Sequence, residues 1–222
     1  SKECFQIVLT SFFFINIATA NENAVQINKK NISTCISSNG IPNHKIGQFP
    51  THGNPHKFRA QNVTYCFPSN PTKRSYRKPS YRARVIGITL TGMPIRPGTA
   101  DWYDASSHRG HSRDKSSGWN LEAIRPFEKI FGIDDTNGHV DRRGLYHYHK
   151  ITDALIKNNN SHIGYAADGF EIHYIKDDLK TSWRLKEGKR PTEPFDNFNG
   201  SFHQDYEYIK IRKIWMSATL II

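Results

Sequence analysis

The sequence predicts an α+β fold rich in β-structure: a single domain of antiparallel strands and hairpins with one or two short helices. Short runs of β-branched and aromatic residues alternate with clusters of Gly, Pro, Asn and Asp, a pattern typical of strands and turns. The best helix candidate is one segment, 121–131, in which apolar residues recur at helical spacing. A length of 222 residues suits one domain, and no internal repeat divides the chain.

The N-terminal residues 1–20 resemble a secretory signal peptide. Lys2 precedes an apolar stretch over 5–17, and Ala18-Thr19-Ala20 supplies the small residues that a signal peptidase needs. We interpret this signal as clipped at its start, because the first residue is Ser1 and not Met. We expect cleavage after Ala20 and a secreted or periplasmic protein. The apolar stretch is shorter than the ~20 residues that span a bilayer, so no membrane span is expected after cleavage; a retained anchor is the alternative.

Cysteine usage fits export. Cys4 leaves with the signal peptide, so Cys35 and Cys66 remain as an even pair in an oxidising compartment. The sequence therefore predicts a Cys35–Cys66 disulfide, with two buried free thiols as the alternative. Residues 21–35 are interpreted as a polar lead-in, mobile over 21–31.

The remaining elements follow in chain order. Residues 37–55 are dense in Gly, Pro, Asn and His and predict ordered turns or a long loop. Strands are expected at 62–67 and 85–90, and a basic run with interleaved tyrosines, 73–84, lies between them. Asn120 can cap the 121–131 helix, which Pro126 should kink or shorten. A second short helix is expected at 152–157, and Asp168-Gly169 predicts a two-residue hairpin between strands 163–167 and 170–175.

The most informative stretch is 138–149, which contains three histidines. Asp141-Arg142-Arg143-Gly144 suits a type I turn, and a left-handed Gly144 would close a three-residue hairpin loop. His139 then pairs with His147, and His149 lies two residues further along the same face. Because cross-strand neighbours lie ~5 Å apart at Cβ, the three imidazoles share one surface, while Tyr146 and Tyr148 face the other way.

Three neutral imidazoles are a ligand set for Zn or Cu that leaves a coordination position open. We therefore predict that His139, His147 and His149 bind one transition metal. Binding should weaken as the pH falls through the imidazole range, near ~6.5. Two alternatives stay open. The histidines can instead hydrogen-bond to backbone or face water, and a register that pairs His139 with Tyr146 would split the set.

The motif Tyr146-His147-Tyr148-His149 is accompanied by other recognisable segments over roughly 36–210. They include Ser38-Asn39-Gly40-Ile41-Pro42-Asn43-His44, Gly98-Thr99-Ala100, Gly138-His139-Val140 and Gly164-Tyr165-Ala166-Ala167-Asp168-Gly169-Phe170. Together they resemble the YHYH protein family, and the resemblance implies an exported domain, 36–210, of unassigned activity. One departure is Glu171-Ile172-His173-Tyr174 in place of the usual Pro-Ile-Tyr-Gly, and we interpret His173 there as a solvent-facing substitute.

The second departure is the C-terminal tail, 211–222. After Tyr208 the family tends to continue with a Leu-Asp-Glu-Cys-Asn-like segment, which this chain lacks. Trp215 and Met216 have one codon each, and in a shifted frame the triplet that spans them encodes Asp. With permitted codons, Ile214 to Ala218 can spell Leu-Asp-Glu-Cys-Asn in that frame, so we hypothesise that the tail is frameshifted.

Three functions follow from these features. The leading one is an exported metal-binding domain. The second is a metal-dependent hydrolase, in which the open metal position activates water and Asp168 or Glu171 acts as base. The third is a polyanion-binding module that uses the basic run 73–84. A net charge of +11 favours an anionic ligand or surface as partner, but export disfavours nucleic acid as that partner.

Overall fold

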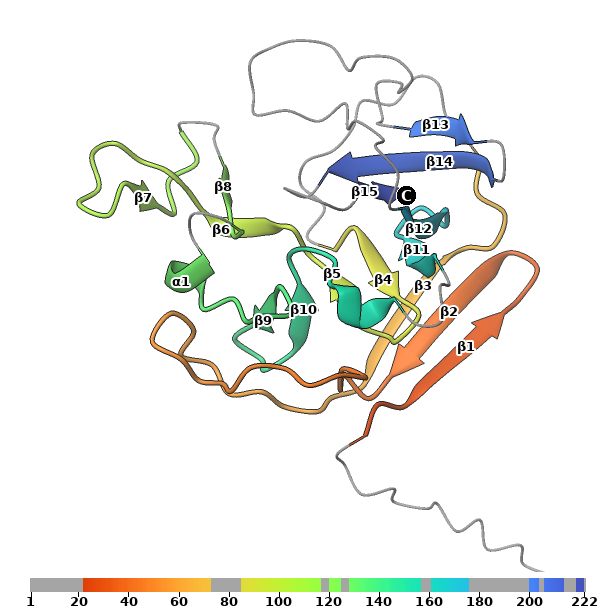
Figure 1. Cartoon of the computed structure of the whole chain (residues 1–222), viewed down its shortest axis with the longest axis horizontal. Helices are drawn as coiled ribbons and strands as arrows, with labels where there is room; N and C mark the ends of the chain where they lie inside the picture. The colour runs from red at the N-terminus through yellow and green to blue at the C-terminus, as the bar shows by residue number, and fades with distance from the viewer. Residues whose placement is uncertain are drawn as a thin grey trace, which may run out of the picture.

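The computed structural model describes residues 22–72, 85–116, 120–124, 128–156, 161–175, 200–203, 206–213 and 219–221. Within these residues the structure is rich in strands, has one short α-helix, and is mostly antiparallel, as the sequence predicts (Figure 1). None of the helices in the described part of the chain is long and apolar enough to cross a membrane. The predicted signal peptide lies outside the described residues.

The largest sheet has nine strands in the order β13-β14-β15-β12-β11-β4-β5-β10-β9. Their bounds in that order are Gly200–His203, Tyr206–Lys213, Thr219–Ile221, Glu171–Ile175, His162–Ala166, Gly87–Thr89, Pro94–Ile95, Tyr146–Tyr148 and Gly138–Val140. Only the contact between β5 and β10 is parallel among the described pairs of this sheet. The predicted histidine hairpin, β9–β10, therefore forms one end of this sheet. Residues 211–213 and 219–221 of the tail form part of this sheet, and the frameshift hypothesis stays a prediction about the coding DNA.

A second sheet joins β1 (Val25–Lys29), β2 (Ser33–Ser38) and β3 (Val63–Pro68) in antiparallel order. Cys35 lies directly opposite Cys66 in the β2–β3 register, and the two form the predicted disulfide. The expectation of a mobile lead-in over 21–31 is wrong for β1, which pairs with β2 along its whole length. Val25 and Ile27 alternate with polar Gln26 and Asn28 in this strand, but only one such alternation is present and its side chains are mostly exposed, so the polar composition of the segment outweighed it.

The third sheet has the order β7-β6-β8, with bounds His111–Ser112, Gly98–Tyr103 and Asn120–Glu122. The predicted helix over 121–131 is wrong at its start, because Asn120–Glu122 pairs with β6 as a strand. Only Glu128–Phe131 forms helix α1. Pairing with β6 overrides the helical spacing here, and the predicted kink at Pro126 lies outside the described residues. The second predicted helix is a single 3₁₀ turn, η1 (Asp153–Leu155), which Thr152 caps.

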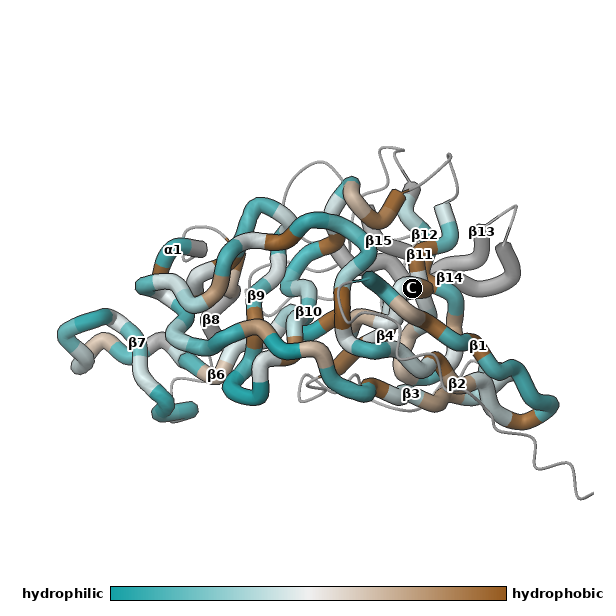
Figure 2. Tube along the Cα trace, turned by 90° about the horizontal axis from the view of Figure 1, so that it is seen from below, coloured by the Kyte–Doolittle hydropathy of each residue, from teal (hydrophilic) through white to brown (hydrophobic). Residues whose placement is uncertain are grey.

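The main core lies behind the histidine hairpin. Tyr146 and Tyr148 are fully buried, and Met93, Ile95 and Ile172 join them in one apolar cluster. Figure 2 shows hydrophobic segments in the middle of the molecule, around β4 and β10, and hydrophilic segments near β7. Burial of such large side chains stabilises the fold by roughly 1.5–3 kcal/mol each. The hairpin is thus held from behind by its own tyrosines.

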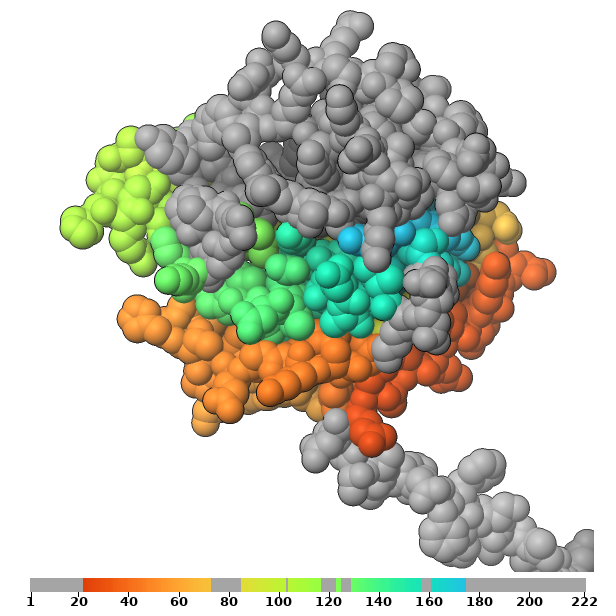
Figure 3. Space-filling view, viewed as in Figure 1, coloured from red at the N-terminus to blue at the C-terminus, as the bar shows by residue number. Residues whose placement is uncertain are grey.

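The segment 39–62, which we call the strap, runs along the outside of the hairpin. In Figure 3 its orange surface lies directly against the green surface of residues 130–150. The Asn54 side-chain amide donates to the carbonyl of Val140 at 2.8 Å, and the Arg59 N–H donates to the carbonyl of Gly144 at 3.0 Å. The predicted loop is therefore an ordered covering that is hydrogen-bonded to β9 and to the turn of the hairpin.

Candidate metal site

The turn between β9 and β10 sets the register of the histidines. The Asp141 carboxylate accepts from the Arg143 and Leu145 N–H groups at 2.8 and 3.2 Å, and Gly144 has a φ of +88°. The Gly144 N–H closes the turn onto the Asp141 carbonyl at 2.8 Å. This is the predicted type I turn followed by a left-handed glycine. His139 consequently lies opposite His147, and the register that would split the histidines does not occur.

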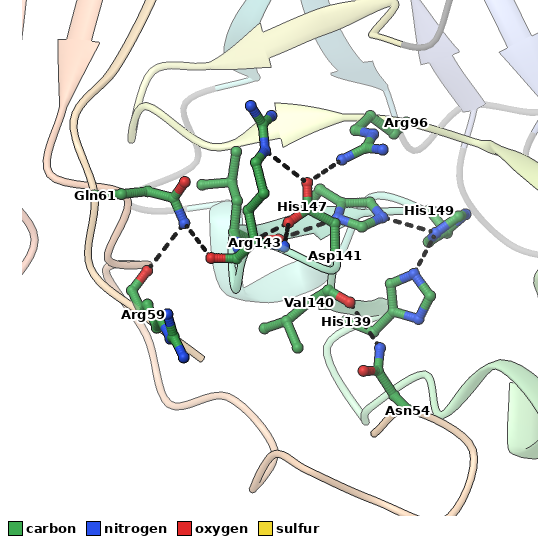
Figure 4. Close-up of polar contacts among 11 residues, drawn as sticks. Asn54, Arg59, Gln61, Arg96, His139, Val140, Asp141, Arg143, His147 and His149 are labelled. Carbon is green, nitrogen blue, oxygen red and sulfur yellow. Dashed lines mark hydrogen bonds and ion pairs between the residues drawn. The ribbon is translucent and has the colours of Figure 1, made fainter. Parts of the chain in front are cut away.

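Three imidazoles converge at one point beside this hairpin. His139, His147 and His149, which we call the histidine trio, have their ligand nitrogens within 4.8 Å of one another. The Nε2 atom of His149 lies 3.1 Å from the Nε2 atoms of both His147 and His139 (Figure 4). For comparison, two nitrogens bound to a tetrahedral Zn²⁺ at 2.0–2.1 Å are separated by about 3.3 Å. The three side chains thus already have the spacing of a metal ligand set.

The backbone fixes which nitrogen of each imidazole carries the proton. The Nδ1–H of His139 donates to the carbonyl of Phe131 at 2.6 Å. His147 and His149 direct Nδ1 at the carbonyls of Leu145 and Pro97, at 3.3 and 3.4 Å. Since a carbonyl only accepts, each Nδ1 holds the proton and each Nε2 presents a lone pair. Three lone pairs that face one another repel in the absence of a cation, and metal-bound histidines commonly use this outer carbonyl contact.

Burial keeps the trio uncharged. His147 and His149 are only 3 % and 2 % exposed, and His139 is partly buried. Burial lowers the pKa of His147 well below its usual value, and the neighbouring His149 adds to the effect. Burial, with a contribution from His139, lowers the pKa of His149 to about 3. Burial also lowers the pKa of His139. Neutral imidazole is the form that binds a metal.

The tyrosines of the motif anchor the opposite face of β10. The Tyr148 hydroxyl lies 2.6 Å from Nε2 of His44 in the strap. The Tyr146 hydroxyl donates to the Asp134 carboxylate at 2.9 Å. Asp134 also accepts from the N–H groups of Thr136 and Gly138, so its role is to hold the chain that leads into β9. Both tyrosines therefore position the histidines from behind, as the predicted alternation requires.

One cation lies close to the trio. The Arg96 side chain, 24 % exposed, forms an ion pair with Asp141 at 3.0 Å (Figure 4). Its positive charge contributes to the lowered pKa of all three imidazoles. The strand pairing places it there, because the Arg96 N–H donates to the carbonyl of Tyr148 between the last two histidines.

Other residues singled out in the sequence do not join the trio. Asp168 lies at the turn after β11, and Glu171 lies at the start of β12, four strands away from β10 in the sheet.

The β11–β12 connection is a three-residue loop rather than the predicted two-residue one. The Ala166 N–H bonds to the Phe170 carbonyl, and Gly169 takes the left-handed conformation. The basic run 73–84 lies outside the described residues.

A second group of metal-ligand side chains was missed in the sequence. His162, Glu171 and His173, which we call the His162 cluster, also have ligand atoms within 4.8 Å of one another. His173 is only 5 % exposed, so its interpretation as a solvent-facing substitute is wrong. The sequence signal was the pair Glu171 and His173 in the departure at 171–174, but the register that places His162 beside them depends on a bulge in β11.

The fold and the trio together define a β-rich domain with a buried three-histidine site on a β-hairpin. The family model described as YHYH protein matches residues 64–217, more than half of the chain. The chain belongs to the YHYH protein family. No curated protein and no solved structure matches it.

Proposed function

We propose that the histidine trio binds one transition-metal ion, Zn or Cu, and that metal binding is the primary function of this domain. One observation carries the proposal. Three Nε2 lone pairs lie at metal-ligand spacing while all three Nδ1 atoms face backbone carbonyls. Neutral, buried and oriented imidazoles are the ligand set that Zn²⁺ and Cu²⁺ prefer.

The trio supplies only three ligands, so a bound metal keeps a position for water or an outside ligand. No carboxylate of the described residues joins the ligand set, which leaves the two charges of a divalent ion uncompensated by its protein ligands. Arg96 adds a further positive charge that Asp141 balances. The outside ligand is therefore expected to be an anion, such as hydroxide, a carboxylate or a phosphate oxygen.

This charge balance favours a metal-dependent hydrolase as the second candidate. A metal-bound water loses its proton near pH 7 and becomes a nucleophile. Arg96, which is now paired with Asp141 and only partly exposed, would exchange part of that pairing for an anionic substrate. The base suggested from the sequence, Asp168 or Glu171, lies in the β11–β12 hairpin, remote from the trio in the sheet. Hydrolysis of phosphate or carboxylate esters that is lost with the metal and strongly reduced in Arg96→Met would support this candidate.

Export is part of the proposal. The Cys35–Cys66 disulfide fits an oxidising compartment, and the N-terminal sequence resembles a signal peptide. A secreted or periplasmic location would also give the trio access to extracellular Zn or Cu. The polyanion-binding alternative depends on the run 73–84 and on net charge alone.

The experiment is elemental analysis and metal titration of the purified protein and its variants. We expect one tightly bound equivalent in the wild type, and a loss of affinity of about 10-fold or more in His139→Ala, His147→Ala and His149→Ala. His108→Ala is the matched control, because His108 is exposed and belongs to neither histidine group. Tyr148→Phe should bind nearly as wild type, since it keeps the buried ring.

The proposal fails if the wild type holds no stoichiometric metal. It also fails if His147→Ala and His149→Ala, shown to be folded by circular dichroism, bind as tightly as the His108→Ala control. In either case the three histidines are structural.

A further inference from the structure

Strands β11 and β12 bring His162, Glu171 and His173 together at a second place in the main sheet. His162 and His173 are direct cross-strand partners, and their rings stack with centroids 5.0 Å apart. Glu171 lies two residues before His173, so both side chains emerge on the same face of β12. The Nε2–H of His173 donates to the carboxylate oxygen of Glu171 at 2.7 Å, so a metal ion bound at this nitrogen takes the place of that proton.

The local contacts orient both imidazoles. The Nε2–H of His162 donates to the carbonyl of Gly164 at 3.0 Å, which makes Nδ1 the acceptor nitrogen. Nδ1 of His173 lies 3.1 Å from the Ser161 hydroxyl, and this contact holds the ring with Nε2 toward Glu171. Such an outer contact on the nitrogen opposite the ligand atom is common in metal-bound histidines.

We propose that His162, Glu171 and His173 form a second, separate binding site for a divalent transition-metal ion such as Zn²⁺. Two imidazoles and one carboxylate are an established donor set for Zn²⁺ and for other first-row metals. The carboxylate supplies a negative charge that the trio lacks. The Glu171 side chain is 51 % exposed, whereas His173 is buried, so the site is open on one side and rigid on the other.

The two sites are too far apart to hold a shared pair of ions. Four strand spacings separate β12 from β10, which corresponds to roughly 19 Å across the sheet at ~4.8 Å per spacing. Metal ions that act together lie about 3.5–4 Å apart. The second site therefore binds its metal independently, and its exposed carboxylate makes the ion more exchangeable than one held by the trio.

The test is a Zn²⁺ titration by calorimetry on the wild type, Glu171→Gln and His149→Ala. We expect two classes of site in the wild type, the weaker of which loses at least about 10-fold in affinity in Glu171→Gln. The tighter class should be lost in His149→Ala alone. Asp168→Asn is the matched control, because it makes the same carboxylate-to-amide change on the same hairpin, outside the cluster.

Substituting Co²⁺ for Zn²⁺ gives a second readout, since its absorption spectrum reports the ligand set at each site. Glu171→Gln should change only the weaker component of that spectrum. If the titration shows a single class of site, and Glu171→Gln keeps that binding while His149→Ala loses it, the second site is refuted and metal binding by the trio is supported. A single class with the opposite response would overturn the trio and support the second site. Equal binding by Glu171→Gln and Asp168→Asn also refutes the proposal.

Discussion

The chemistry of the trio depends on which nitrogen of each imidazole carries the proton. The carbonyls of Phe131, Leu145 and Pro97 accept from Nδ1 and leave the Nε2 lone pair available for the proposed metal. No feature of the linear sequence predicts these three contacts, because each carbonyl belongs to a different segment of the chain. The residue types could be predicted, but the tautomer depends on the tertiary structure.

The lowered histidine pKa values predict how the metal-free protein responds to acid. An unfolded histidine has a pKa near 6.5, whereas that of buried His149 is about 3. Below pH ~6.5 the unfolded chain therefore binds more protons than the folded one, and the unfolding free energy falls as the pH falls toward 3. His149 alone contributes a slope of up to about 1.4 kcal/mol per pH unit.

Urea unfolding at pH 7.5, 5.5 and 4.5 measures this slope. We expect a shallower slope in His149→Gln than in the wild type, and an unchanged slope in the exposed control His108→Gln. The same low pKa values move the expected loss of bound metal below the pH ~6.5 predicted from the sequence. Equal slopes in all three proteins would show that His149 is not held neutral by burial.

At the scale of the element, the sequence predicts the turn and register of the histidine hairpin, but it does not predict the length of the β11–β12 loop or the His162 cluster. Asp141 and Gly144 encode the turn locally, and the register of His139 and His147 follows from it. The sequence predicts a two-residue loop at Asp168-Gly169, whereas the structure has a three-residue loop. Both loop types end in Gly, because the longer one is a type I turn followed by a left-handed glycine. The His162 cluster depends on the bulge between His162 and Gly164, and no pattern of residues in the sequence predicts that bulge.

Gly144→Ala tests the turn. At a φ of +88° an added Cβ is strained, and it would meet the Lys57 carbonyl at 2.6 Å. We expect a loss of unfolding free energy toward the upper end of about 1–3 kcal/mol, with weaker metal binding because the turn sets the register. Gly110→Ala is the matched control: its φ is +71°, but no atom lies within 4 Å of the added Cβ.

Chemical denaturation and metal titration of both variants supply the comparison. The Gly110→Ala variant should lose about 1 kcal/mol from backbone strain alone and keep its metal. If Gly144→Ala loses no more stability than Gly110→Ala, the strap does not pack tightly on the turn.

At the scale of the whole molecule, the strap connects the N-terminal sheet to the histidine hairpin. It begins where β2 ends, three residues after Cys35, and ends where β3 begins, three residues before Cys66. Between them, Asn54 contacts β9, Arg59 contacts the turn, and His44 contacts Tyr148 of β10. The disulfide thus closes the loop that covers the site. Composition and the expected export predicted the bond itself, but its relation to the proposed metal site required the fold, because Asn54 and Val140 are far apart in sequence.

Removing the disulfide should therefore destabilise the whole domain. For a separation of 31 residues, loop entropy predicts that the Cys35→Ser/Cys66→Ser variant loses about 3–4 kcal/mol of unfolding free energy. Because only the folded chain holds the trio together, saturating Zn²⁺ should restore part of that loss, by an amount that grows with the ratio of free metal to Kd. Thermal melts with and without Zn²⁺ measure both effects.

A reductant should lower the melting temperature of the wild type and leave that of the double variant unchanged. If the reductant shifts both proteins equally, its effect does not come from the disulfide; if Zn²⁺ stabilises neither, the metal does not bind the folded state, and the covered hairpin is not a metal site.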